Sequence, residues 1–202
     1  MTIPLLLFLF ATLIPVFFAK IHTAPFWLAA QAAALAGVIA QHKGYSFHTL
    51  AEIGVILVVR AALTPGLLHQ AIRRRSTSEL NLLPSNLFVW TIGVTLVLLA
   101  FEFAAPVSMS REAFTLGVVG ATIVVALLLL STNGSAAAQL VAVLFMENAL
   151  ALFESLLSTP WPLAVRSILD LTYLLTVFVG AWLIGTPETH PVAKSKAKED
   201  DI

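Results

Sequence analysis

Several charged side chains lie inside strongly apolar stretches of the sequence, and their chemistry suits proton transfer. They are Glu52, Arg60, Glu147, Glu154, Arg166 and Asp170. A charge at mid-membrane depth costs roughly 2.5–3.5 kcal/mol on insertion scales, so such residues are rare and usually functional. Carboxyl groups take up and release protons, and a nearby arginine favours their ionised form. These residues predict proton or ion handling within the bundle, and in a proton pathway Glu147 and Asp170 would be the central carboxyl groups.

Glu147 and Glu154 are separated by nearly two helical turns and therefore share one helix face. Glu147 lies deep in the apolar run Ala142–Ala151, and Glu154 lies near the end of the same predicted helix. We expect the two carboxylates to form successive steps of one path. Two alternatives remain open: Glu154 is a wetted interfacial residue, and Glu147 stays protonated and hydrogen-bonds a neighbouring helix.

Arg166 and Asp170 are one helical turn apart in the last apolar segment. An arginine and an aspartate at this spacing can neutralise each other within lipid. Two interpretations follow. The pair is purely structural, or Arg166 adjusts Asp170 so that the carboxyl group exchanges a proton.

Another apolar segment carries His48, Glu52 and Arg60. His48 and Glu52 are one turn apart near the predicted exterior end, so they form either an interfacial pair or part of a relay. Arg60 lies too deep to reach water easily, and we expect it to find a carboxylate or water within the bundle or in a partner subunit. Pro65 removes a backbone hydrogen bond and predicts a local kink.

The remaining polar groups predict structural roles. Gln31 and Asn148 lie at depth and are expected to bridge helices. Glu102, followed by Pro106, is expected at an interface. The histidines His22 and His69 lack partners at metal-ligand spacing, and hydrolase and phosphate-loop motifs are absent. The sequence therefore predicts no metal site, no bound cofactor and no catalytic residues of its own.

The composition is that of a membrane protein. Of the 202 residues, 59% are hydrophobic and 11% are charged, whereas about a quarter of residues are charged in soluble domains. The net charge is zero, which disfavours nucleic acid as a partner. The chain has no cysteine, so it can hold no iron–sulfur cluster or disulfide. Any redox chemistry must belong to partner proteins.

Hydropathy predicts an all-α, polytopic bundle in the lipid bilayer with about seven transmembrane helices. One domain covers residues 1–184, and a polar, disordered tail covers residues 185–202. The stretch Met1–Lys20 lacks the positive start of a signal peptide and is interpreted as the first span. The predicted spans are 2–19, 24–41, 49–70, 86–105, 112–131, 137–157 and 161–184.

The distribution of lysine and arginine predicts the orientation, since cytoplasmic loops are enriched in these residues. Only Lys43 and Arg111 lie on one side. The other side is richer and carries Lys20, Arg73, Arg74, Arg75, Lys194, Lys196 and Lys198. We therefore expect the N-terminus outside and the C-terminus in the cytoplasm. Residues 1–70 and 112–184 each contain three spans and form a possible internal repeat.

Two segments resemble a known family. The stretch Ala137–Leu150, with its Met-Glu-Asn sequence at residues 146–148, resembles the Met-Glu-Asn-Gly helix of hydrogenase-4 component E, although Ala149 replaces the glycine. That subunit is related to the K subunit of respiratory complex I and the C subunit of Mrp antiporters. By this resemblance, Glu147 and Asp170 correspond to two mid-membrane acids of the proton pathway. The segment Val58–Gly66 is also similar, and Arg60 takes the place of a lysine.

The resemblance implies a non-catalytic membrane-arm subunit of a complex-I-like redox complex, of the group 4 hydrogenase or formate hydrogenlyase type. It further implies a multi-pass protein of a bacterial or archaeal inner membrane. Antiporter-like membrane subunits and soluble redox subunits would be its partners, with Fe–S clusters in those partners and Ni–Fe as well where the complex is a hydrogenase. The alternatives are a subunit of a Mrp-type cation/proton antiporter, an independent secondary transporter and a purely structural docking subunit.

Overall fold

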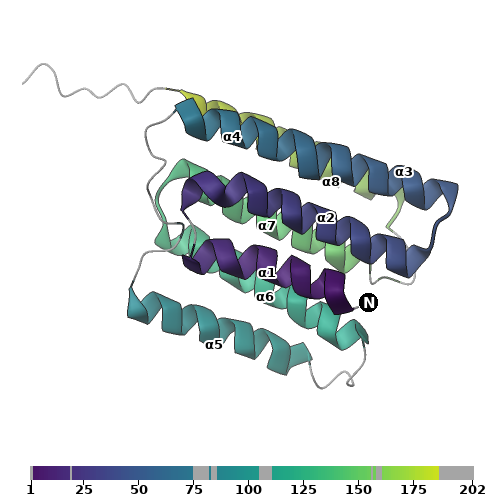
Figure 1. Cartoon of the computed structure of the whole chain (residues 1–202), viewed down its shortest axis with the longest axis horizontal. Coiled ribbons are helices and arrows are strands. Elements are labelled where there is room, and N and C mark those ends of the chain that lie inside the picture. Colours follow the sequence, from purple (N-terminus) through teal and green to yellow (C-terminus); the bar gives the residue numbers. More distant parts are fainter. Residues whose placement is uncertain are drawn as a thin grey trace, which may run out of the picture.

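The chain folds as a bundle of helices whose axes run nearly parallel (Figure 1). This computed structural model describes residues 2–18, 20–74, 82, 86–104, 111–155, 157 and 161–186. In chain order the elements are α1 (Thr2–Phe18), η1 (Ile21–Thr23), α2 (Ala24–Lys43), α3 (Phe47–Val55), η2 (Ile56–Leu63), α4 (Thr64–Arg74), α5 (Leu87–Ala104), α6 (Arg111–Thr132), α7 (Ala136–Glu154) and α8 (Leu163–Gly185). The predicted tail beyond residue 186 lies outside the described residues.

The helices agree closely with the predicted membrane spans. Six of them are long and apolar enough to cross a bilayer: α2, the continuous α3–η2–α4 helix, α5, α6, α7 and α8. The first predicted span forms α1, an apolar helix of 17 residues. At 1.5 Å per residue it is about 25 Å long, which falls short of a hydrocarbon core about 30 Å thick. The chain is thus a helical membrane bundle.

The helices form two packed rows. One row contains α1, α2 and α3–η2–α4, and the other contains α6, α7 and α8, with α5 resting on α6 (Figure 1). Across the rows α1 packs on α6, α2 on α7 and α4 on α8. Each helix of residues 1–70 thus faces its counterpart in residues 112–184. The duplication itself stays a prediction.

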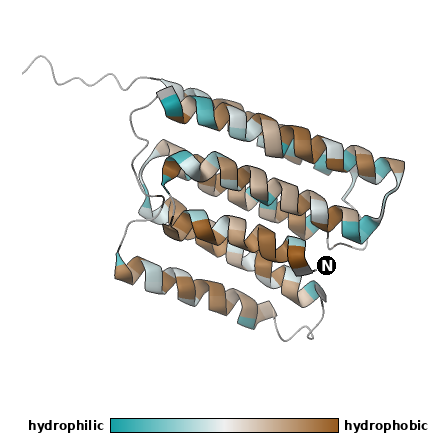
Figure 2. Ribbon diagram, in the orientation of Figure 1, coloured by the Kyte–Doolittle hydropathy of each residue, from teal (hydrophilic) through white to brown (hydrophobic). Residues whose placement is uncertain are grey.

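α2 and α7 lie at the centre of the bundle, and both helices carry fully buried small residues. Ala32, Ala138, Ala142 and Ala149 are all fully buried on these two helices. Small side chains let helix backbones approach closely within a membrane. Hydrophobic residues cover the lengths of the helices and hydrophilic ones gather toward their ends (Figure 2). This pattern suits a bundle surrounded by lipid.

The predicted disturbance at Pro65 takes the form of a π-helix. Residues Ile56–Leu63 are wound with π-type hydrogen bonds, and the hydroxyl group of Thr64 donates to the carbonyl oxygen of Val59 at 2.9 Å. Because proline has no N–H and clashes with the preceding turn, the backbone widens just before it. Arg60 lies within this widened segment.

Candidate functional site: a charged pocket between α3, α7 and α8

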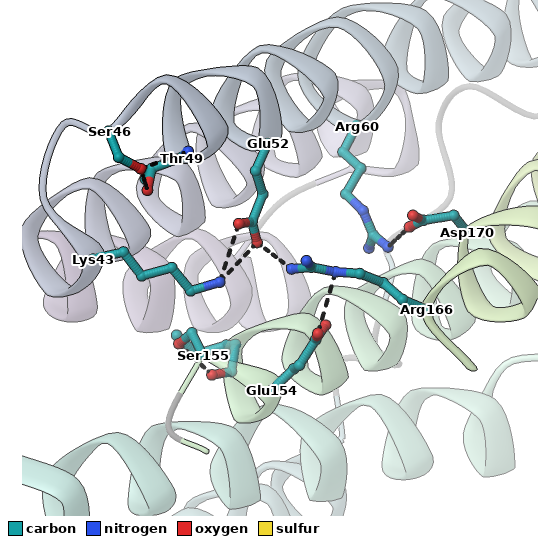
Figure 3. A network of polar contacts seen from close by, with 10 residues as sticks. Lys43, Ser46, Thr49, Glu52, Arg60, Glu154, Ser155, Arg166 and Asp170 are labelled. Atoms are coloured by element: carbon teal, nitrogen blue, oxygen red, sulfur yellow. Dashed lines mark hydrogen bonds and ion pairs between the residues drawn. The ribbon is translucent and has the colours of Figure 1, made fainter. Parts of the chain in front are cut away.

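An outer cluster of charges lies where four helix ends meet. The Nζ atom of Lys43 lies 3.1 and 3.0 Å from the two carboxylate oxygens of Glu52. The guanidinium group of Arg166 binds the same carboxylate of Glu52, and its Nε atom lies 3.2 Å from Oε1 of Glu154. Figure 3 shows the Arg166 side chain between the two carboxylates. α2, α3, α7 and α8 are therefore joined by one ionic network.

A tight turn brings Lys43 to Glu52. α2 ends at Lys43, and Gly44 adopts a positive φ of 72° that side chains other than hydrogen disfavour. Ser46 then caps α3 by accepting a hydrogen bond from the backbone N–H of Thr49 at 3.2 Å. The turn reverses the chain within a few residues, so the last residue of α2 faces the second turn of α3.

An inner cluster surrounds Arg60, which is 7% exposed. Its Nη1 atom donates a hydrogen bond to Oδ1 of Asn148 at 3.0 Å, and its Nη2 atom lies 3.6 Å from Oδ1 of Asp170. The guanidinium carbon also lies 4.0 Å from the centre of the Tyr173 ring, a cation–π contact. Arg60 thus finds the carboxylate that its depth requires, together with an amide and an aromatic ring.

Buried amides continue inward from Arg60. The side-chain nitrogen of Asn148 donates to Oε1 of Gln31 at 2.8 Å, and the side-chain nitrogen of Gln31 donates to the hydroxyl oxygen of Thr12 at 2.7 Å. Thr12, Gln31 and Asn148 are fully buried. The prediction that Gln31 and Asn148 bridge helices is therefore confirmed.

Two pockets connect the clusters. An inner pocket of about 320 Å³ is lined by Arg60, Glu147 and Asp170 among mostly apolar side chains of α3, η2, α7 and α8. An outer pocket of about 370 Å³ includes Lys43 and His42 near the helix ends. The residues that line both pockets are His48, Glu52, Glu154 and Arg166. The ionic network therefore stands at the junction between the pockets.

All six residues predicted for the pathway line the inner pocket. They are Glu52, Arg60, Glu147, Glu154, Arg166 and Asp170. Glu147 is partly buried and shares the pocket wall with Arg60 and Asp170. It lies about 10 Å along α7 from Glu154, seven residues away. Carboxyl groups thus occur both near the helix ends and at mid-depth of one pocket.

Among the described residues, the ion pairs join different helices and not the same-helix neighbours considered from the sequence. Arg166 contacts Glu52 and Glu154, while Asp170 contacts Arg60. Arg166 and Asp170 share a helix, but the side chains of neighbouring helices offer closer partners. Glu52 likewise forms its ion pairs with Lys43 and Arg166, and not with its same-helix neighbour His48. Glu154 is only 12% exposed at its side chain, so it is part of the cluster and not a freely wetted residue.

Sequence reasoning missed three members of the site: Thr12, Lys43 and Tyr173. Lys43 is separated from Glu52 by one short turn, which is a usable signal. Tyr173 follows Asp170 by three residues and so shares its helix face. Thr12 carried no signal beyond being polar within an apolar span. Glu102, in contrast, is exposed at the end of α5 and away from the pocket.

The described residues contain no group of three or more His, Asp or Glu side chains placed to hold a metal ion. The site instead offers proton-exchanging carboxyl groups, fixed cations and space for water between them. None of the protein families, curated proteins or solved structures compared with the chain matches it.

Proposed function

We propose that this protein is a membrane subunit that relays protons between the helix ends and mid-membrane through the charged pocket. The observation that carries the proposal is the pair of adjoining pockets, with carboxyl groups at both depths. Glu52 and Glu154 would exchange protons with the outer pocket. Glu147 and Asp170 would hold them at depth.

Charge balance supports this role. Glu147 and Asp170 both face the inner pocket, where Arg60 is the buried cation. One arginine balances one carboxylate, and a second uncompensated negative charge is costly in lipid. The two carboxyl groups would therefore share one proton between them. Arrival of a proton at either group changes which carboxylate Arg60 stabilises, and this is the elementary step of a relay.

We further propose that the subunit works in the membrane arm of a complex-I-like assembly. The support is the likeness of the Met146–Asn148 helix and the Val58–Gly66 segment to hydrogenase-4 component E. Since the chain has no cysteine, electron transfer would take place in partner subunits that carry Fe–S clusters and, in a hydrogenase, Ni–Fe. This chain would contribute protonatable groups and no redox centre.

The first experiment identifies the assembly. An affinity-tagged chain is extracted from native membranes in a mild detergent, and the proteins that remain bound are identified by mass spectrometry. Antiporter-like subunits together with redox proteins would support the full proposal. Antiporter-like subunits alone would replace it with a cation/proton antiporter. A lone monomer or a homo-oligomer would overturn the assembly.

The second experiment tests the relay. Everted membrane vesicles are energised with hydrogen, formate or NADH, and a fluorescent dye reports their acidification. Glu147→Gln and Asp170→Asn should each lower acidification by about tenfold or more, because positioned proton-transfer groups contribute at least that factor. Glu102→Gln, which changes an exposed acid on α5, is the matched control and should behave as wild type.

Assembly is checked in the same vesicles by the amount of tagged complex. The proposal requires lost acidification with an intact complex and continued oxidation of the donor. If both pocket variants acidify the vesicles as the Glu102→Gln control does, the carboxyl groups do not relay protons.

A further inference from the structure

A line of hydrogen bonds crosses the bundle from the α1 side to the charged pocket. It runs from the Thr12 hydroxyl on α1 to Gln31 on α2, Asn148 on α7 and Arg60 on η2, with donor–acceptor distances of 2.7, 2.8 and 3.0 Å. Arg60 then meets Asp170 on α8. Five separate segments of the chain are joined by one polar connection through a largely apolar core.

Each bond in this line fixes the direction of the next. The hydroxyl hydrogen of Thr12 is donated to the carbonyl oxygen of Phe8 at 3.1 Å, which leaves its oxygen free to accept from Gln31. Gln31 must therefore present its nitrogen to Thr12 and its oxygen to Asn148. Asn148 in turn presents its nitrogen to Gln31 and its oxygen to Arg60.

The orientation of Asn148 matters because its amide has two unlike ends. If the amide turned round, an NH₂ group would face the guanidinium of Arg60, and two donors would meet without an acceptor. An unsatisfied buried donor is costly, so Arg60 would move away from that position. The geometry of Arg60 against Asp170 thus depends on a hydroxyl group three hydrogen bonds away.

We propose that Thr12, Gln31 and Asn148 are positioning residues that hold Arg60 against Asp170 and beside Glu147. The inference deepens the proposed function, on which the importance of Arg60 rests. The line is an anchor and not a proton path. It ends at the backbone carbonyl of Phe8, and side-chain amides do not accept and release protons as carboxyl groups do.

The test compares variants that differ only in the hydroxyl group. Thr12→Val keeps the shape of threonine and removes the acceptor, while Thr12→Ser keeps the hydroxyl. Thr122→Val is the matched control, because Thr122 is equally buried and donates to the carbonyl oxygen of Val118 in the same way, but on α6 and outside the line. If Thr12→Val does not accumulate, Thr12→Ala against Thr12→Ser makes the same comparison.

Coupling to Arg60 is measured first, on the purified full chain in detergent. Thr12→Val should lower the melting temperature by about 2–4 °C, the shift expected for one lost buried hydrogen bond in a chain of this length. In an Arg60→Met background the same change should lower the melting temperature by less than half as much, since there is then no arginine to be displaced from Asp170. Thr122→Val should lower the melting temperature by the same amount in both backgrounds. If Thr12→Val lowers the melting temperature equally in both backgrounds, the inference is overturned.

Proton transfer is measured second, in the everted vesicles. Thr12→Val should lower acidification by about threefold or more through misplacement of Arg60. Thr12→Ser and Thr122→Val should match wild type. A Thr12→Val variant that acidifies like Thr122→Val would remove the positioning role, provided that Glu147→Gln lowers acidification as expected. If Glu147→Gln has no effect, the proposed function fails, and the melting experiment alone decides whether the line positions Arg60.

Discussion

Arg60 illustrates how a charge is accommodated deep in an apolar bundle. Its position in the middle of a long helix prevents the side chain from reaching either membrane surface. Asn148 comes from α7, and Asp170 and Tyr173 come from α8, so two neighbouring helices satisfy one guanidinium group. Arginine suits this position because its planar group offers donors in several directions and a face to an aromatic ring.

The Glu52 carboxylate stands between the outer and inner pockets, bound on two sides by cations. Glu52→Gln should weaken both ion pairs and admit water-soluble reagents to the inner pocket. A cysteine placed at Val59, on the inner wall, would report this in a chain that has no other cysteine. We expect its reaction with a charged thiol reagent to accelerate about fivefold, the factor that corresponds to about 1 kcal/mol.

Glu102→Gln provides the control for this measurement, since it changes the same kind of side chain at an exposed position on α5. Labelling of the Val59 cysteine should not change in that variant. Equal labelling rates in the Glu52→Gln and Glu102→Gln backgrounds would mean that the ionic network does not separate the two pockets.

At the scale of elements, close contact between α7 and α8 keeps the carboxyl groups of these helices on one pocket. A Cβ atom at Gly180 would lie 2.5 and 2.7 Å from the two methyl carbons of Leu140. Gly180→Val should therefore push α8 away and destabilise the protein by about 1–3 kcal/mol, as overpacking does. The melting temperature of the purified chain should fall by about 2–4 °C for each kcal/mol.

The control is Gly54→Val, because a Cβ atom at Gly54 meets nothing within 4 Å. Shortening the opposing side chain provides a stricter check. In the double variant Gly180→Val with Leu140→Ala, the melting temperature should recover part of the loss. If Gly54→Val lowers the melting temperature as much as Gly180→Val does, or if the double variant melts no higher than Gly180→Val alone, the contact with Leu140 does not cause the destabilisation.

The elements themselves were predictable because their signal is local. A run of apolar residues about 20 long forms a membrane helix wherever it lies, and Pro65 disturbs the backbone in any context. The π-helical form of that disturbance was not predictable, since a kink satisfies the same constraint.

The pairings of charged residues could not be predicted for a related reason. The spacing of Arg166 and Asp170 on one helix favours a mutual contact, but the choice of partner depends on how α8 is rotated against α3 and α7. That rotation is set by packing across the whole interface, including Gly180 and Tyr173. Hence the sequence could place the six charged residues in one region and could not say which carboxylate each arginine binds.

At the scale of the whole molecule, the outer pocket lies at one end of the bundle, where α2 and α7 end and α3 and α8 begin. The turn that contains Tyr45 lies at this end, and Arg73 lies at the opposite end of the α3–η2–α4 helix (Figure 1). The excess of lysine and arginine on the side of Arg73 predicts that this side is cytoplasmic. The outer pocket would then face the exterior, and the relay would exchange protons with that compartment.

Single cysteines test this orientation directly. Tyr45 and Gln70 are both exposed and lie near opposite ends of the bundle. In intact cells, a membrane-impermeant thiol reagent should label Tyr45→Cys and spare Gln70→Cys, because only the exterior is accessible to it. In everted vesicles the preference should reverse, and labelling after detergent treatment confirms that both cysteines react. The opposite pattern would place the outer pocket in the cytoplasm, and the relay would then take up its protons from the inside.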